Sequence, residues 1–160
     1  MNILHAPGFD FLETSEEPAL YNNFMDTCIF CKIVTGEVPS YKVYEDEYFE
    51  GFLDVYPISK GHALLVPKKH YRWTHDVENF GAYWEAAKVV ALKLQKALGA
   101  SWIQFVTHGQ IPHAHIHIIP RYDDVKTAPQ VANGGKTLTF SKEEFEKILR
   151  SLDSTSSLSG

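Results

Sequence analysis

Three histidines, His113, His115 and His117, alternate with alanine and isoleucine in the run HAHIHIIP. Because successive side chains of a β-strand point to opposite faces, this spacing predicts three imidazoles on one face and the apolar residues on the other. A strand needs no histidine to fold, and an unpaired imidazole is unfavourable to bury. Near neutral pH, imidazole serves as a nucleophile, a proton carrier and a metal ligand. The run therefore predicts a chemically active site beside the hydrophobic core.

Apolar periodicity predicts the elements that must hold this run in place. The clearest is a long helix over residues 77–98, with an apolar stripe from Phe80 to Leu98 and Gly99 as its stop. A final helix over 142–152 begins at a capping box of Ser141 and Glu144. A short helix is predicted over 28–34, and strands over 41–45, 48–54, 62–66 and 101–106. Mostly adjacent strands with one long and one late helix predict an α+β fold, an antiparallel sheet with helices packed on it.

The length of 160 residues fits one folded domain with its own core. We expect residues 26–153 to form this domain. The acidic, irregular segment 1–25 is predicted to be an arm, either a flexible tail or a strap that packs on the core or on a second subunit. Residues 154–160, STSSLSG, are predicted to be a disordered tail.

Composition and charge argue against several classes of function. The net charge of −5 gives no global electrostatic case for binding DNA or RNA, although a local cluster of imidazole and lysine can still hold a small anion. No apolar run is long enough to span a membrane, and the N-terminus lacks the pattern of a signal peptide. The two cysteines, Cys28 and Cys31, are predicted to be a metal clip or reduced thiols rather than a disulfide framework. We therefore expect a cytoplasmic protein.

Three separated blocks of the sequence resemble the histidine triad (HIT) superfamily. Gly109-Gln110 followed by HAHIHII is similar to the signature of that family, and CIFCKIVTGEVPSYKVYEDE and FLDVYPISKGHALLVPKKH resemble its N-terminal and central segments. The resemblance covers residues 28–122 in the same order. It implies a nucleotide-binding α+β fold, a homodimer with two-fold symmetry, and hydrolysis or transfer of nucleoside monophosphates. A purine nucleotide is the expected substrate.

The resemblance also implies roles for individual residues. His115 is expected to attack the α-phosphorus and form a covalent nucleotidyl-imidazole intermediate, which water or another acceptor then resolves. His117 and His62 are expected to contact the phosphate. Gln110 is expected near the scissile or bridging atom, and Asp54 is expected to accept both ribose hydroxyls. The expected nucleoside pocket consists of Phe30, Ile33, Val38, Phe52 and Val55.

Some branches of this family carry zinc on two such cysteines and two histidines. In this chain the resemblance places the four ligands at Cys28, Cys31, His70 and His113, a Cys₂His₂ set typical of closed tetrahedral sites. A closed site leaves no open position, so this zinc is expected to be structural. Its ligation would also fix His113, which counts among the catalytic histidines of the triad and lies two residues before His115.

The loop before the triad departs from the pattern of the family. The stretch QFVTHGQIPH lacks the usual asparagine, and only two residues separate Gln110 from His113. Thr107, His108 or Gln104 could take the place of the asparagine. The serine or threonine that often donates to the leaving group just after the Gly-Gln pair is also absent. These departures leave the leaving-group chemistry and the class of substrate open.

Three functions are therefore compatible with the sequence. The first is a phosphoramidase or nucleotide hydrolase that releases a nucleoside monophosphate, with a dinucleoside polyphosphate hydrolase or a nucleotidyl transferase as near alternatives. The second is a hydrolase in which His113, His115 and His117 all bind one catalytic zinc, although the cysteines offer a better closed site. The third is a nucleotide-binding module with little catalysis.

Overall fold

Five antiparallel strands form one sheet within residues 27–122 and 137–156, the parts of the chain that the computed structural model describes. The spatial order of the strands is β1-β2-β3-β5-β4, which places β1 and β4 at the two edges. The strands are β1 (Lys42–Glu45), β2 (Phe49–Leu53), β3 (Ala63–Pro67), β4 (Trp102–Val106) and β5 (Ile116–Arg121). The arm predicted over residues 1–25 lies outside the described residues.

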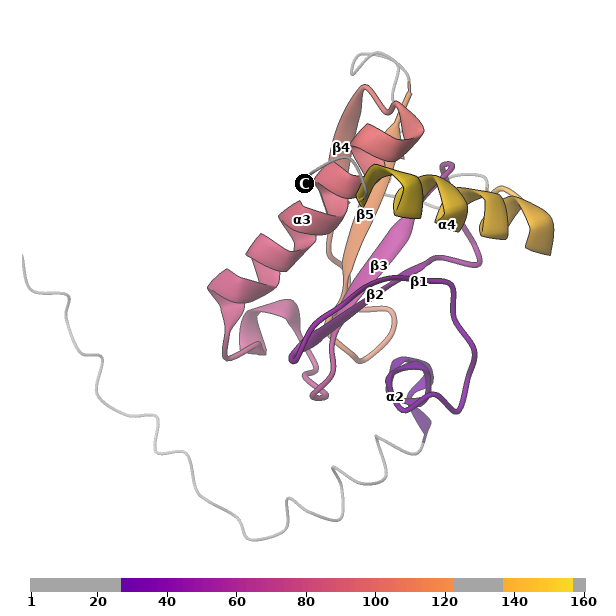
Figure 1. Cartoon of the computed structure of the whole chain (residues 1–160). Helices are drawn as coiled ribbons and strands as arrows, with labels where there is room; N and C mark the ends of the chain where they lie inside the picture. Colours follow the sequence, from indigo (N-terminus) through magenta and orange to yellow (C-terminus); the bar gives the residue numbers. More distant parts are fainter. Residues whose placement is uncertain (1–26, 123–136, 157–160) are drawn as a thin grey trace, which may run out of the picture.

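Helices lie on both sides of this sheet. The long α3 (Phe80–Leu98) and α4 (Lys142–Ser156) lie together on one side, and the short α2 (Ile29–Val34) lies on the other (Figure 1). A single 3-10 turn, η1 (Thr74–Asp76), precedes α3. The arrangement confirms the predicted α+β fold with an antiparallel sheet, a long helix and a late helix.

Alternation along the strands divides the hydrophobic core into two clusters. The larger cluster fills the space between the sheet, α3 and α4, where the buried hydroxyl of Tyr83 donates a hydrogen bond to the carbonyl of Leu65 (2.6 Å). The smaller cluster lies under α2 and consists of Cys28, Phe30, Cys31, Phe52, Leu64 and Val66. Because Leu64 pairs with His117 in the sheet, this smaller cluster lies beside the histidine run.

The long helix begins three residues later than the sequence predicts. Val77 is buried but extended (φ −65°, ψ 115°), and the helix starts at Phe80 after the N-cap residue Asn79. Tyr83 is the residue of the first helical turn that packs in the core, where its hydroxyl bonds to the carbonyl of Leu65. Phe80 is 46% exposed, which corrects its predicted place in the core. Gly99 ends the helix with φ +67°, as predicted.

The final helix begins as predicted and is longer than predicted. The side chain of Glu144 accepts from the backbone N–H of Ser141 (2.7 Å), and the Ser141 hydroxyl accepts from the backbone N–H of Glu144 (3.3 Å). The helix continues to Ser156, so residues 154–156 of the predicted disordered tail are helical. In the last turns, the hydroxyl of Ser154 donates to the carbonyl of Ser151 (2.9 Å). Within the described ranges, no helix combines the length and the apolar character that a membrane span requires.

Candidate active site

The histidine run joins the sheet only at its third imidazole. Pairing between β3 and β5 ends at Leu65 and Ile116, and the backbone N–H of Ala114 donates instead to the carbonyl of Tyr71 (2.6 Å). Only His117 therefore lies on a paired strand, which corrects the prediction that one strand face carries all three imidazoles. The residues between the histidines are buried in the core, which confirms the predicted alternation.

The three imidazoles consequently divide between two sites. His113 turns toward the cysteines of the smaller cluster, with Nδ1 3.4 Å from Sγ of Cys28. His115 and His117 stay together, with ring centroids 5.0 Å apart. The arrangement does not support the alternative in which His113, His115 and His117 share one metal ion.

One hydrogen bond determines which ring nitrogen of His115 carries the proton. Its Nδ1 lies 2.7 Å from the carbonyl oxygen of His113, which can only accept, so Nδ1 carries the proton. The lone pair of the neutral ring is therefore on Nε2. The side chain is buried, and burial lowers its pKa below the usual range. Neutral imidazole with a free Nε2 is the form that attacks phosphorus.

A chain of hydrogen bonds sets the proton of His117 in the same way. The backbone N–H of Ile58 donates to Nδ1 of His62 (3.3 Å), which leaves the proton of His62 on Nε2. That Nε2 lies 2.9 Å from Nδ1 of His117 and donates to it. His117 then carries its own proton on Nε2, a buried atom with no hydrogen-bond partner among the described residues. This N–H is free to donate to a bound anion.

Burial keeps these two imidazoles neutral. It lowers the pKa of His62 to about 4, against the opposing effect of the Asp54 carboxylate. It lowers the pKa of His117 to about 3, and the neighbouring His62 adds to the effect. Asp54 Oδ2 lies 3.5 Å from Nδ1 of His62, and Asp54 Oδ1 accepts from the backbone N–H of Tyr56 (2.8 Å).

The residues of the expected nucleoside pocket are only partly gathered. Phe30 and Phe52 lie with ring centroids 5.8 Å apart, and Ile33 packs against the same cluster. Phe30 also contacts the ring of His115 edge-on at 5.2 Å, so the two aromatic rings adjoin the reactive imidazole. Val38 is half-buried, whereas Val55 is 58% exposed, so these two lie at most at the rim.

The loop before the triad places His108 against the catalytic histidines but leaves Gln110 in solvent. Gln110 is exposed, and within the described residues its side chain makes no hydrogen bond or ring contact with the histidines, so its catalytic role stays a prediction. His108 instead stacks on His117, with ring centroids 4.4 Å apart. The sequence marks His108 only as one of three substitutes for a missing asparagine. Its contact with the triad spans a loop, and no periodic pattern could have indicated it.

The second site is a buried cluster of two thiols and two imidazoles. Cys28, Cys31, His70 and His113 are all buried, and their ligand atoms lie within 4.8 Å of one another. The Nδ1 atoms of His70 and His113 lie 3.2 and 3.5 Å from Sγ of Cys31. Zinc–sulfur and zinc–nitrogen bonds of tetrahedral geometry place such atoms about 3.6 Å apart. The spacing therefore suits a tetrahedral ion.

The surroundings of the cluster also suit a cation. Nε2 of His113 donates to the carbonyl of Pro67 (2.9 Å), so the lone pair on Nδ1 points toward the thiols, as in metal-bound histidines. Without a cation, burial and the neighbouring Cys28 raise the pKa of Cys31 to about 12. A bound Zn²⁺ would supply the charge that two adjacent thiolates need.

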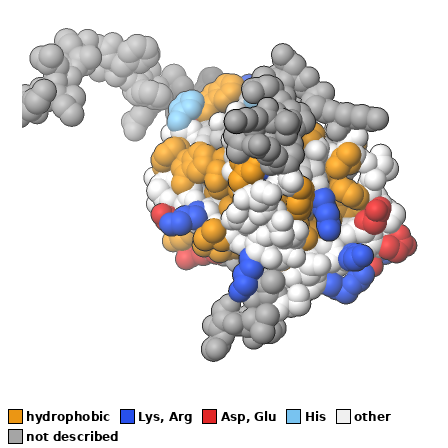
Figure 2. Space-filling view, turned by 90° about the horizontal axis from the view of Figure 1, so that it is seen from above, with side chains coloured by type: hydrophobic (Ala, Val, Ile, Leu, Met, Phe, Trp, Pro, Cys, Tyr) orange, Lys and Arg blue, Asp and Glu red, His pale blue; other side chains and the backbone are white. Residues whose placement is uncertain are grey.

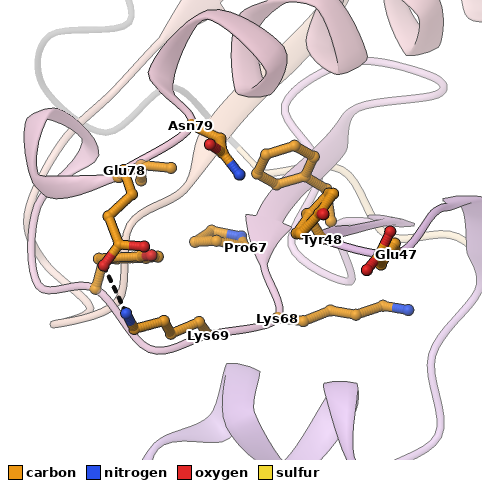
Figure 3. A pocket seen from close by; sticks show the side chains of 10 residues that line it. Glu47, Tyr48, Pro67, Lys68, Lys69, Glu78 and Asn79 are labelled. Carbon is orange, nitrogen blue, oxygen red and sulfur yellow. Dashed lines mark hydrogen bonds and ion pairs between the residues drawn. The ribbon is translucent and has the colours of Figure 1, made fainter.

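A separate pocket lies at the C-terminal end of β3, beside Pro67, and is unsuited to an anionic substrate. It is lined by residues including Tyr48, Pro67, Lys68, Lys69, Glu78 and Asn79 (Figure 3). Both lysines are already paired, Lys69 with Glu78 (2.6 Å) and Lys68 with Glu45 (2.9 Å). Their charges are neutralised within the protein, so the histidine cluster is the better candidate for binding a phosphate.

Comparison with known proteins identifies the class to which this fold and site belong. The sequence model of the HIT domain matches residues 35–124, more than half of the chain, so the chain belongs to the HIT family. The adenosine 5'-monophosphoramidase of Saccharomyces cerevisiae is 36% identical over 103 residues, which cover 61% of this chain and 64% of that protein.

Solved structures share the fold. A hypothetical histidine triad nucleotide-binding protein from Sulfolobus tokodaii superimposes with a TM-score of 0.68 at 29% identity, covering 80% of this chain and 91% of that chain. A Zn-bound histidine triad family protein from Mycobacterium smegmatis superimposes with a TM-score of 0.61 at 26% identity, covering 83% of this chain and 98% of that chain.

Proposed function

We propose that this protein is a nucleotide hydrolase that releases a nucleoside monophosphate from a phosphoramidate, through a covalent intermediate on His115. The observation that carries the proposal is the hydrogen bond from Nδ1 of His115 to the carbonyl of His113, which leaves Nε2 as a free nucleophile. Membership of the HIT family and the similarity to a yeast adenosine 5'-monophosphoramidase support the same reaction.

The reaction proceeds in two displacements at the α-phosphorus. Nε2 of His115 forms a bond to phosphorus as the bond to the leaving group breaks. Water then attacks phosphorus, the bond to Nε2 breaks, and the nucleoside monophosphate leaves. His117 donates a hydrogen bond from its Nε2–H to a phosphate oxygen as charge builds there and keeps its proton, and His62 holds His117 in that tautomer.

The nucleoside is bound between the two aromatic rings and a carboxylate. Phe30 and Phe52 offer apolar surface to a purine ring beside His115. Asp54 is 13% exposed at its side chain and retains acceptor capacity on Oδ2, which suits a pair of ribose hydroxyls. A purine nucleoside therefore lies with its 5'-phosphate over Nε2 of His115.

The test is turnover of adenosine 5'-phosphoramidate and a diadenosine polyphosphate by the wild type and His115→Ala. We expect wild-type turnover with preference for the phosphoramidate, and none above background in the variant. Arg150→Ala, on the exposed face of α4, is the control and should match the wild type. Preference for the diadenosine compound would assign the other branch of the reaction, and nucleotide binding without turnover would indicate a binding module.

We also propose that Cys28, Cys31, His70 and His113 hold one structural zinc ion. The four ligands, their spacing and the hydrogen bond from His113 to Pro67 support this proposal. The ion would tie α2 to the histidine run and so fix the peptide carbonyl that orients His115. All four positions of a tetrahedral ion are then filled by the protein, so the zinc takes no part in the chemistry.

We propose that the protein forms a homodimer, as its resemblance to the HIT family implies. Strand β4 is a sheet edge, and its side chain Phe105 is 39% exposed. On α3, Val89 and Leu92 are 51% and 56% exposed. Figure 2 shows hydrophobic side chains among charged ones on the face seen from above. A second copy that pairs with β4 and covers α3 would bury Phe105, Val89 and Leu92.

A further inference from the structure

His108 is a fourth imidazole beside the reactive pair. Its ring stacks on His117 (4.4 Å between centroids, 29° between planes) and meets His115 edge-on (5.2 Å, 90°). One ring nitrogen from each of the three histidines lies within 4.8 Å of the others. A single phosphoryl group with its leaving atom is large enough to contact all three nitrogens. His108 is exposed, unlike the other two, so it faces the side from which substrate and solvent enter.

A hollow lies beside His108. It has a volume of about 220 Å³ and is lined by Arg72, Trp73, His75, Thr107, His108 and Gly109. Ala114, which lies between His113 and His115 in the sequence, also lines it. The hollow therefore adjoins the histidine pair through His108 and Ala114.

A close approach between two loops holds His108 in place. A Cβ atom on Gly109 would collide with the indole ring of Trp73, so only glycine allows the loop to lie this close. The segment that carries Trp73 is in turn fixed to the triad, since the Tyr71 carbonyl accepts from the backbone N–H of Ala114. The position of His108 thus depends on the contact between Gly109 and Trp73, which a side chain at position 109 would prevent.

We propose that His108 is the acid–base residue that protonates the leaving group, and that the hollow beside it receives that group. The proposal rests on the proposed function, in which Nε2 of His115 is the nucleophile. Of the side chains that line the hollow, His108 is the one whose ring also contacts both His115 and His117.

His108 both gives the proton that the first step requires and takes back the proton that the second step releases. As Nε2 of His115 bonds to phosphorus, the P–N bond breaks, and its electron pair goes to the leaving nitrogen. That nitrogen takes a proton from the imidazolium of His108 and departs as an amine. In the second step water attacks phosphorus, its proton goes to His108, and the electron pair of the broken bond returns to Nε2 of His115.

The chemistry of the hollow also indicates which leaving groups it takes. The guanidinium of Arg72 lies over the ring of Trp73 at 4.7 Å. Among the described residues, no carboxylate lies within ion-pair distance of it. An uncompensated guanidinium on an aromatic face favours an anionic group. We therefore expect leaving amines that carry a carboxylate or phosphate to be preferred over neutral amines.

The test compares leaving groups that differ in their need for a proton. An alkylamine phosphoramidate of AMP requires protonation of the departing nitrogen, whereas the 4-nitrophenyl ester of AMP loses a stable phenolate. For His108→Ala we expect kcat/KM to fall about 100-fold on the phosphoramidate and less than about threefold on the ester. His108→Asn, which keeps a hydrogen-bond donor but transfers no proton, should show the same split.

A second arm tests the hollow. Arg72→Gln should lower kcat/KM about tenfold for the phosphoramidate of an amino acid and leave the neutral alkylamine substrate unchanged. Arg150→Ala, an exposed arginine on α4, serves as the matched control. Equal losses on both substrates in Arg72→Gln would overturn the assignment of the hollow.

The outcomes separate this inference from the proposed function. If His108→Ala loses activity equally on the ester and the phosphoramidate, or on neither, His108 is not the acid. If His115→Ala keeps full turnover on both substrates, the proposed function itself fails. Loss of all turnover in His115→Ala with an unaltered His108→Ala would overturn the inference alone.

Discussion

His62 and His117 share a hydrogen bond of 2.9 Å between Nε2 of the first ring and Nδ1 of the second. Because the backbone N–H of Ile58 donates to the other nitrogen of His62, the bond runs from His62 to His117. This hydrogen bond leaves His117 with its proton on Nε2, the nitrogen that has no partner among the described residues. A donor prepared in this way needs no reorganisation when charge builds on a phosphate oxygen, which is how preorganised sites stabilise transition states.

His62→Asn should lower kcat while the protein still binds the nucleotide. The variant loses the ring that fixes the tautomer of His117, so the proton of His117 is no longer directed at the substrate. We expect kcat to fall on the order of 100-fold, the effect of removing one preorganised donor. Steady-state kinetics, with binding measured separately by calorimetry, would check this. An unchanged kcat would show that His117 does not depend on His62.

Asp54→Asn should remove discrimination between ribose and deoxyribose. A carboxylate accepts from both hydroxyls of a ribose, whereas an amide offers only one acceptor atom. We expect the wild type to prefer the adenosine substrate over its 2'-deoxy analogue by about tenfold, and the variant to prefer neither. The measurement is kcat/KM for the two substrates in both proteins. A variant that discriminates as the wild type does would place the ribose elsewhere.

Acid should destabilise the fold through the buried histidines. Burial lowers the pKa of His62 to about 4, below the value of about 6.5 for an unfolded chain. Between these values the unfolded state binds more protons, so stability falls as the pH falls through this window. From pH 7 to pH 5, His62 alone should account for a loss of about 2 kcal/mol.

Thermal and denaturant unfolding at several pH values, with excess zinc present, would check this dependence. His62→Asn should flatten the curve between pH 7 and pH 5. Equal slopes for the two proteins would mean that His62 is already protonated in the folded state, or that it is not buried in solution.

Removal of one cysteine should release the metal and loosen the site. We expect one zinc ion per chain in the wild type and none in Cys31→Ser, whose hydroxyl is a poor zinc ligand. The variant should unfold at a markedly lower temperature, since binding energy at a structural site is also folding energy. Metal content by atomic emission and unfolding by calorimetry give the two readings.

His115→Ala is the control for the metal site. It should keep the zinc, because His115 lies with His117 rather than with the cysteines. Loss of zinc from His115→Ala with retention in Cys31→Ser would instead place the metal on the triad.

Leu92→Glu should convert the protein from a dimer to a monomer. Leu92 is 56% exposed on α3, and a carboxylate there would be desolvated in an interface that covers this helix. Sedimentation equilibrium should give twice the chain mass for the wild type and the single-chain mass for the variant. Tyr48→Glu changes an equally exposed aromatic residue away from α3 and should leave the dimer intact. A wild-type monomer would refute the proposal.

The sequence predicts those features of the fold that depend on short-range patterns. The capping box at Ser141, the stop at Gly99 and the apolar alternation around His115 each follow from a few neighbouring residues, and the structure confirms them. The family blocks place Cys28 with His70 and His113, and the structure brings these residues together.

Features that depend on contacts between distant segments could not be predicted in this way. Strand β5 begins only at Ile116, because the backbone N–H of Ala114 bonds to Tyr71 rather than to the neighbouring strand. Phe80 is exposed although it follows the helical apolar spacing, because burial in the first turn is decided by contacts with the sheet, which Tyr83 makes. His108 meets His117 only because Gly109 allows two loops to approach, and neither residue type nor spacing indicates that contact.

A search for the covalent intermediate tests directly whether His115 is the nucleophile. Wild-type protein is mixed with adenosine 5'-phosphoramidate for less than one turnover, quenched at alkaline pH and mapped by peptide mass spectrometry. We expect one adenylyl group, on His115, in the wild type and in Arg150→Ala, and none in His115→Ala. Rapid turnover without any adduct, or an adduct on His108 or His117 instead, would contradict the assignment of His115 as the nucleophile.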